Sequence, residues 1–264
     1  MSKVLGKQEL ALLAYVQMRN LQKIRSDDLR RSLNLSAAQT QNLLSRMQRR
    51  KLIAQVRKGL YLVPQKLPLG GVWSPDDATA IQALMDDKNA SYQITGPNAF
   101  NRYGYDEQIP AGYYIYNNSI SGKRKIGQID LTLIKVLPER LGDIESVTTH
   151  SGEILIYSSR VRTLVDAVYD WSRFDSLPRA YDWIRNDILN DRIKPLSLVK
   201  TAIKYGNTGT IRRMGVLLEL LESNESLLKR LEKELAPTNA KIPFIPTRPL
   251  RGRLIKRWGV IVNE

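Results

Sequence analysis

The sequence predicts an α+β fold in two parts. A small basic domain covers residues 1–66, and a larger mixed α/β domain with a helical C-terminal half covers residues 76–264. Apolar residues at helical spacing alternate with short β-branched and aromatic runs in both parts. The segment "PQKLPLGGVWSPDD" holds three prolines and a Gly-Gly pair, which predicts a linker at residues 67–75. Of the net charge of +15, residues 1–66 carry +11, from 14 Lys and Arg against three acids.

The composition excludes several classes of site. The chain has 264 residues and no cysteine, so disulfides, thiolate catalysis and cysteine zinc sites are excluded. Its one histidine, His150, cannot form a two-histidine metal cluster, and we expect neither a metal nor a cofactor. No run of about 18 apolar residues occurs, so no membrane partner is expected. Because Glu9 leads the first apolar stretch and no cleavage motif follows, we expect a cytoplasmic protein.

The first 66 residues predict three helices. "GKQELALLAYVQMRNLQ" has apolar residues at a helical period with one buried face. Ser26 is the expected N-cap of the second helix, with Asp27 and Asp28 in its first turn. Ser36 is the expected N-cap of the third helix, "AAQTQNLLSRMQRRK".

The third helix has one apolar and one polar face. Its polar face changes from small and amide-rich to cationic toward the C-terminal end. Glutamine and asparagine can read base edges in the major groove, and arginines can bind phosphates. The predicted DNA contacts on this face are Gln41, Asn42, Ser45, Arg46 and Arg49.

Two β-type runs, "LIAQV" and "LYLVP", follow directly and are joined by Arg57-Lys58-Gly59. Gly59 supplies the positive φ that so tight a turn often needs. Three helices followed by a basic hairpin predict a winged helix-turn-helix, with Arg57 and Lys58 beside the DNA backbone. The competing interpretation is a solvated turn. Double-stranded DNA is favoured over an anionic membrane surface because residues 1–66 contain neither Trp nor Phe.

The second part predicts a helix that begins with Ser74 as N-cap and Pro75 at its first position. The strand-like runs are "GYYIYN", "IDLTLIKVL", "EILIYS" and a closing "WGVIVN". The predicted helices are 160–171, 178–190, 195–205 and one long amphipathic helix from about 209 to 235.

Catalytic motifs are scarce in this part, and we expect no enzyme. Asp130 and Lys135 resemble a nuclease pair, but Leu133 replaces the second carboxylate and a separation of five residues points the two side chains to opposite strand faces. "GKRKIG" predicts a basic hairpin tip, either solvated or in contact with an acidic partner or nucleic acid. Arg160 and Arg162 lie in the first turn of a helix, where they oppose its dipole, although Asp166 can pair with Arg162.

Five segments in order resemble the AbiEi-type antitoxins of type IV toxin–antitoxin and abortive-infection systems. They are "RKGLYLVP", "YQITGPNAFNRYGYDEQ", "ILIYSSRVRTLVDAVYD", "RRMGVLLELLE" and "WGVIVN", spread over nearly the whole chain. The resemblance implies a cytoplasmic bacterial protein whose N-terminal domain binds inverted repeats in its own promoter and represses it. It also implies a C-terminal domain that opposes a nucleotidyltransferase toxin without a stable complex.

The resemblance supplies no catalytic residues. The predicted antitoxicity contacts are therefore the cations that stability does not explain, namely Lys123, Arg124, Lys125, Arg160 and Arg162. Two other functions stay open at this point. One is a winged-helix transcription factor that senses a small molecule, and the other is a DNA-tethered nuclease.

Overall fold

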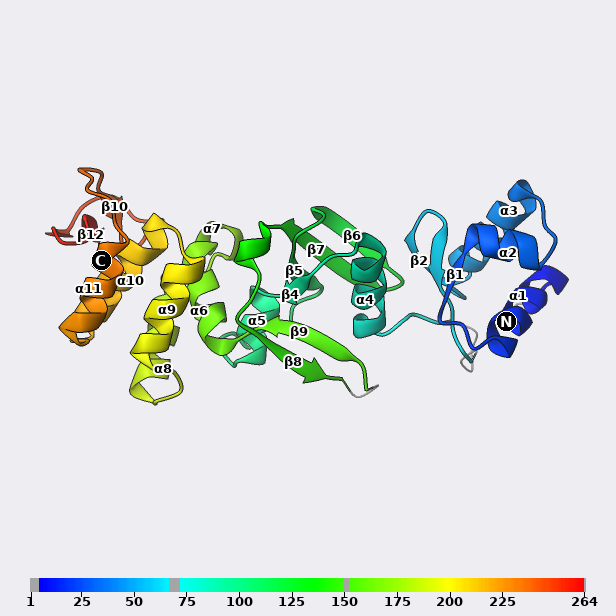
Figure 1. The fold of residues 1–264 in the computed structure, drawn as a ribbon, viewed down its shortest axis with the longest axis horizontal. Helices are drawn as coiled ribbons and strands as arrows, with labels where there is room; N and C mark the ends of the chain where they lie inside the picture. The colour runs from blue at the N-terminus through cyan, green and yellow to red at the C-terminus, as the bar shows by residue number, and fades with distance from the viewer. Residues whose placement is uncertain (1–4, 67–71, 150–151, 264) are drawn as a thin grey trace. The chain divides into compact units, whose positions relative to one another are not determined.

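The computed structural model describes residues 5–66, 72–149 and 152–263 and has a mixed α+β fold (Figure 1), which confirms the predicted class. His150 and most of the predicted linker lie outside the described residues. The α-helices are α1 (Lys7–Met18), α2 (Ser26–Ser32), α3 (Ala37–Arg49), α4 (Asp77–Lys88), α5 (Pro97–Arg102), α6 (Arg160–Tyr169), α7 (Trp171–Phe174), α8 (Arg179–Leu189), α9 (Pro195–Tyr205), α10 (Thr208–Leu220) and α11 (Glu225–Lys233). A 3₁₀ turn, η1, covers Pro138–Arg140. The strands are β1 (Lys23–Arg25), β2 (Ala54–Arg57), β3 (Leu60–Leu62), β4 (Tyr92–Ile94), β5 (Tyr113–Asn117), β6 (Gly122–Ile126), β7 (Ile129–Lys135), β8 (Ile144–Thr148), β9 (Ile154–Ser158), β10 (Ile242–Pro243), β11 (Arg253–Ile255) and β12 (Val260–Val262).

The chain divides into two compact units, and each unit is made of three separate stretches of the sequence. The first comprises residues 1–92, 111–135 and 148–155, and the second comprises the remaining segments, 93–110, 136–147 and 156–264. The first unit thus contains α4 and strands β5 to β7 as well as the N-terminal helices. The boundary at 67–75 stays a prediction.

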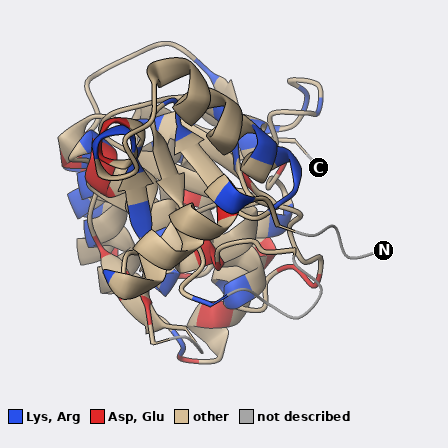
Figure 2. Cartoon of the chain, turned by 90° about the vertical axis from the view of Figure 1, so that its right-hand side faces the viewer, with Lys and Arg blue, Asp and Glu red and all other residues tan. Residues whose placement is uncertain are grey.

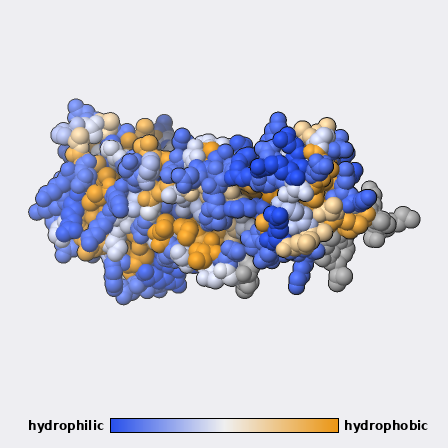
Figure 3. All heavy atoms as spheres, turned by 45° about the vertical axis from the view of Figure 1, so that its right-hand side comes forward, coloured by the Kyte–Doolittle hydropathy of each residue, from blue (hydrophilic) through white to orange (hydrophobic). Residues whose placement is uncertain are grey.

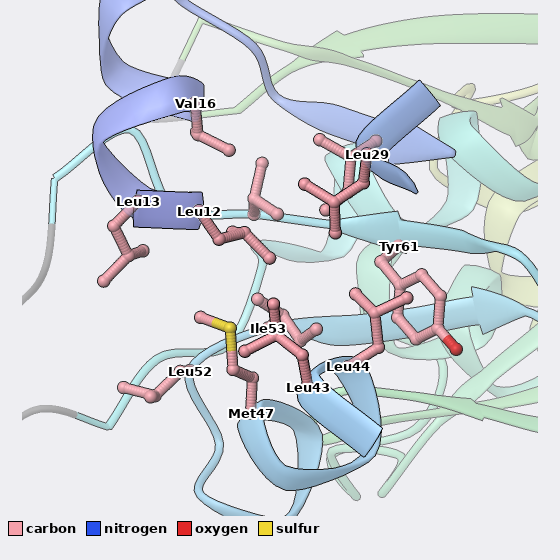
Figure 4. Close-up of a cluster of buried hydrophobic side chains, with 12 residues drawn as sticks. Leu12, Leu13, Val16, Leu29, Leu43, Leu44, Met47, Leu52, Ile53 and Tyr61 are labelled. Atoms are coloured by element: carbon pink, nitrogen blue, oxygen red, sulfur yellow. The ribbon is translucent and has the colours of Figure 1, made fainter. Parts of the chain in front are cut away.

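The N-terminal segment of the first unit has the order α1, β1, α2, α3, β2, β3, with its strands in the sheet order β1-β3-β2. Figure 4 shows its core, in which leucines of α1, α2 and α3 converge with Met47 and with Tyr61 of β3. The sequence did not predict β1. Only Ile24 of this short strand is buried, and three residues are too few to produce an alternating pattern.

Two backbone N–H groups, those of Trp73 and Gln128, make hydrogen bonds that link the rest of the first unit to this segment. The Trp73 N–H donates to the Lys51 carbonyl at 2.7 Å. Strand β7 pairs in parallel with β5 and antiparallel with β6, and the turn between β6 and β7 is formed by Gly127 and Gln128. The Gln128 N–H donates to the Ser74 hydroxyl at 3.1 Å. These contacts fix the β6–β7 hairpin against the N-terminal segment within the unit.

In the second unit, α6, α8, α9 and α10 supply most of the buried apolar side chains. Strand β9 pairs in parallel with β4, through Ile94 and Tyr157. A small sheet of order β10-β12-β11 closes the chain. Trp258 before β12 packs on α10 at Gly215, where a Cβ would lie 2.4 Å from the indole ring, so only glycine fits without a shift.

Three predicted helix boundaries are corrected. The N-cap of α2 is Arg25, one residue before the predicted Ser26. The N-cap of α4 is Asp76, whose carboxylate accepts the Thr79 N–H at 2.9 Å, and not Ser74. The long helix predicted over 209–235 is two helices, because Glu222 adopts a φ of +52° and Asn224 caps α11.

In the described part of the chain, no helix is long and apolar enough to cross a membrane. The face drawn in Figure 3 is mainly hydrophilic, with separate hydrophobic patches. Isolated apolar side chains of this kind are common on protein surfaces and identify no interface by themselves.

Candidate nucleic-acid interface

Helix α3 is set at its start by a capping box. The Ser36 hydroxyl accepts the Gln39 N–H at 3.2 Å, and the Gln39 side-chain oxygen accepts the Ser36 N–H at 2.8 Å. Two backbone donors that a helix start leaves unpaired are therefore satisfied. The buried residues of α3 are Thr40, Leu43, Leu44 and Met47, all on the side away from the predicted DNA contacts. This burial fixes which face of α3 is left exposed.

The exposed face of α3 carries the residues predicted to contact DNA. Gln41, Asn42, Arg46 and Arg49 are exposed and Ser45 is half-buried. The Gln41 amide donates to the Ser45 hydroxyl at 3.2 Å, one turn along the helix. The face presents hydrogen-bonding groups suited to base edges, followed by cations suited to phosphates.

Glu9 of α1 holds the C-terminal end of α3. Its carboxylate is 1% exposed and accepts hydrogen bonds from Arg50 and, at 3.1 Å, from Arg46. Burial alone would raise the pKa of Glu9, but the Gly6 N–H and the two guanidinium groups outweigh burial and lower it. Arg46 is therefore part of a structural ion pair, and its half-exposed side chain presents its remaining N–H groups to solvent.

The β2–β3 hairpin separates its two cations. Arg57 forms a two-pronged ion pair with Asp87 of α4, with nitrogen–oxygen distances of 2.6 and 2.7 Å. Asp87 is nearly buried, and the hydrogen bond from Arg57 lowers the pKa of its carboxyl group despite burial. Lys58 is exposed and Gly59 has a φ of +82°, which confirms the turn prediction. Lys58 is thus the cation that the hairpin offers to solvent, whereas Arg57 joins the hairpin to α4.

The predicted antitoxicity residues belong to different compact units. Lys123, Arg124 and Lys125 are in the first unit and Arg160 and Arg162 in the second. The three cations of "GKRKIG" are strand residues of β6 and not the predicted hairpin tip, because the turn follows at Gly127 and Gln128.

Strand β6 also lies beside the C-terminal end of α3. Lys125 lines a cavity of about 410 Å³ together with Arg49 and Lys51. The fold thus brings a predicted antitoxicity residue next to a predicted DNA contact.

The prediction that Arg162 contacts a partner is corrected. Its side chain is fully buried and donates to Asp166 at 2.9 Å and to the carbonyls of Arg140 and Gly142. The predicted pair with Asp166 is confirmed, and it is structural. Arg160, in contrast, is partly exposed and pairs with Asp187 at 3.2 Å.

Basic and acidic residues both occur on the ribbon drawn in Figure 2, and several cations are paired. Within the described ranges, no group of three His, Asp or Glu side chains is arranged to hold a metal ion. Asp130 pairs with Lys125 at 3.1 Å on the exposed side of the β6–β7 hairpin. These observations give no support to a nuclease site in the described residues.

Sequence reasoning missed the two acids that organise the interface. Glu9 is 41 residues from Arg50 and Asp87 is 30 residues from Arg57. Glu9 was conspicuous as a lone acid on an apolar helix in a basic segment, which is the one signal that pointed to a buried partner. Nothing local identified Asp87.

No family model and no curated protein matches this chain. Among solved structures, the chain is similar to the crystal structure of the RV2827C protein from Mycobacterium tuberculosis, with a TM-score of 0.59 and 13% sequence identity. The match covers 98% of this chain and 92% of the other. At this identity the likeness extends to the fold alone.

Proposed function

We propose that the protein binds double-stranded DNA through a winged helix-turn-helix, with α3 as the recognition helix and β2–β3 as the wing. The element order, with the strand order β1-β3-β2, supports this proposal. The observation that carries it is the exposed face of α3, whose amides and arginines lie opposite a core of Leu43, Leu44 and Met47. In a winged helix of this kind, such a face enters the major groove.

Charge supports the same proposal. Residues 1–66 carry +11 of the net charge of +15, and exposed cations occur on α3 and at Lys58. Lys125, which pairs with Asp130, lines the same cavity as Arg49. Cations at these places would bind phosphates without regard to sequence and would make binding depend on salt.

The experiment is a titration of labelled DNA with the full chain, followed by fluorescence anisotropy. The DNA comes from the region upstream of the gene, with a shuffled fragment as control. We expect tighter binding to the upstream DNA and a steep loss of affinity for both fragments with salt. Equal and salt-independent binding of the two fragments would refute the proposal.

We further propose that the protein is a type IV antitoxin that represses its own operon through promoter inverted repeats and counteracts a nucleotidyltransferase toxin. The support is the sequence resemblance in five segments from "RKGLYLVP" to "WGVIVN". The two activities are separable in this proposal.

The test of antitoxicity uses the full chain, because a cut at residue 70 would divide the first compact unit. Cells expressing the neighbouring nucleotidyltransferase receive either the wild-type chain or the Gln41→Ala, Asn42→Ala double variant from an unrelated promoter. We expect both to restore growth. Failure of the wild-type chain would leave repression as its only proposed activity.

A second candidate function, a ligand-sensing transcription factor, is favoured by one observation. A cavity of about 470 Å³ in the first unit is lined by residues of α2, β1 and α4, including Arg25 and Asp87. Its size is within the range of small-molecule sites. A small molecule bound in this cavity would contact Asp87 and could thereby change the ion pair between Asp87 and Arg57.

A further inference from the structure

The second unit contains a cavity of about 730 Å³ that neither proposed activity uses. Its cationic lining comes from Arg160 at the start of α6, Arg192 in the turn before α9, and Lys200 and Lys204 of α9. We refer to it as the α6 cavity.

One carboxylate lies near both arginines of the α6 cavity. Asp187 is 1% exposed, and its oxygens lie 3.2 Å from Arg160 and 3.6 Å from Arg192. The Tyr105 hydroxyl donates to the same carboxylate, and burial raises the pKa of Tyr105, so that it stays a donor. Arg160 is thus hydrogen-bonded to Asp187, whereas the exposed Arg192 is drawn toward the same charge at a longer distance. Each retains N–H donors that Asp187 does not use.

Two exposed lysines of α9 add positive charge to the cavity wall. Lys200 and Lys204 are both exposed and lie one turn apart on α9, where like charges repel. Lys204 lies over the ring of Tyr205, and Lys200 has no ion pair within the described residues. Lys204 lies in the last turn of α9, where a cation stabilises the helix, whereas Lys200 in the middle of α9 has no such role.

The start of α6 adds a positive potential to the same cavity. Ser159 caps α6 by accepting the Arg162 N–H, which leaves the N–H groups of Arg160 and Val161 in the first turn. The two acids in the wall have partners. Asp143 accepts the Thr201 hydroxyl at 2.9 Å, and Glu145 lies 4.0 Å from Arg102. Positive charge therefore exceeds negative charge in the cavity.

We propose that the α6 cavity binds a phosphorylated small molecule of the size of a nucleoside triphosphate. Arginines, lysines and the start of a helix are groups that bind phosphate oxygens, and all three occur in the cavity wall. The volume lies in the range of sites for molecules of this size and exceeds what a triphosphate group alone would fill. The carboxylates of Asp143 and Glu145 would accept hydrogen bonds from hydroxyl or amino groups, which a nucleoside has and inorganic phosphate lacks.

A nucleic-acid backbone fits the same features less well. A backbone is an extended chain of phosphates, whereas these cations surround one hollow that also contains two carboxylates. The proposal therefore commits to a small molecule and leaves nucleic acid as an outcome of the test.

The test is isothermal titration of the full-length protein with the four ribonucleoside triphosphates and with tripolyphosphate. We expect at least one nucleotide to bind more tightly than tripolyphosphate. Lys200→Ala and Lys204→Ala should each weaken that binding by roughly tenfold, the loss of one charge-assisted contact. Lys233→Ala, which removes an exposed lysine of α11 outside the cavity, should leave it unchanged.

Thermal unfolding of each variant checks that the fold is intact, which we expect because both lysines are exposed. Absence of binding by every nucleotide and by tripolyphosphate would overturn the proposal. Nucleotide binding that survives the two substitutions would overturn the assignment to the α6 cavity. Equal affinity for tripolyphosphate would overturn the nucleoside part. Loss of DNA affinity in the lysine variants, with no nucleotide binding, would assign the cavity to nucleic acid instead.

Discussion

Glu9 is the residue on which the orientation of α1 against α3 depends. Its buried carboxylate accepts hydrogen bonds from the Gly6 N–H and from two arginines near the end of α3. The sequence predicted Arg46 as a free DNA contact because a helical wheel separates the faces of one helix and contains no information on its neighbours. The pair with Glu9 is set by tertiary packing, which brings residues 37 positions apart into contact.

We predict that this contact makes the stability of the first unit depend on pH. The pKa of Glu9 is lower in the folded chain than its ordinary value of 4.5, so its contribution is present above pH 4.5 and is lost as the pH falls. Glu9→Gln should lower the free energy of unfolding at pH 7 by about 1.5–3 kcal/mol. The variant should also lose less of its free energy of unfolding than the wild type as the pH falls below 4.5. Urea unfolding between pH 3 and 7 measures both effects. Asp27→Asn, at an exposed acid of α2, is the control, and an equal effect of the two substitutions would contradict the prediction.

Arg162 and Asp166 form the corresponding buried pair in the second unit. Both side chains are fully buried, and Arg140 approaches the same carboxylate at 3.1 Å. Burial raises the pKa of Asp166, and the two guanidinium groups oppose that rise.

We predict that Arg162→Ala destabilises the protein by about 3–5 kcal/mol, because it leaves a buried carboxylate with one partner fewer. Thermal or urea unfolding measures the loss. Arg192→Ala, at an exposed arginine of the same unit, should cost less than about 1 kcal/mol. If the two substitutions have equal effects on unfolding, the structural role of Arg162 is wrong.

At the scale of elements, α3 was the most predictable part of the chain. A serine N-cap, an apolar face at helical spacing and a cationic end are all local signals, and the structure has the predicted N-cap and one buried face. Helix length was predictable where apolar spacing was regular, as in α6 and α9. The break between α10 and α11 was not, because amphipathic spacing continues across Leu221–Asn224 while the backbone turns at Glu222.

The β2–β3 hairpin was predictable as an element but not in its contacts. The sequence treats Arg57 and Lys58 as two equal cations at a turn. In the folded chain, Asp87 of α4 lies against Arg57, and Lys58 stays exposed.

We therefore predict different effects for the two residues. Lys58→Ala should weaken binding to upstream and random DNA alike. It should also reduce the slope of log K against log salt concentration by about 1, as expected for the loss of one phosphate contact. Arg57→Ala should lower the free energy of unfolding by at least about 1 kcal/mol, because Asp87 loses its main partner. Anisotropy at several salt concentrations and urea unfolding separate the two. Lys7→Ala, an exposed lysine of α1, controls for the loss of charge, and a DNA effect of Arg57→Ala without a stability effect would contradict this assignment.

At the scale of the whole molecule, the fold class and the order of the major elements could be predicted from local patterns. The division into compact units could not, because the first unit joins three separate stretches of chain. The contacts that create it, such as Arg57 with Asp87 and Ser74 with Gln128, connect residues 30 and 54 positions apart. Of the candidate site, the exposed face of α3 was predictable, whereas burial of Arg162 and the placement of Lys125 beside Arg49 depend on such distant contacts.

The most direct test of the central claim, that α3 reads DNA sequence, uses the Gln41→Ala, Asn42→Ala double variant of the full chain. Competition anisotropy at one salt concentration compares its affinity for the preferred upstream sequence with that for random DNA. Gln17→Ala, at an exposed amide of α1, is the matched control. We predict that the double variant loses about 1–3 kcal/mol of preference for the upstream sequence for each bidentate base contact removed, with little change in affinity for random DNA. An unchanged preference, or an equal loss of affinity for both DNAs, would contradict the assignment of α3 as the recognition helix.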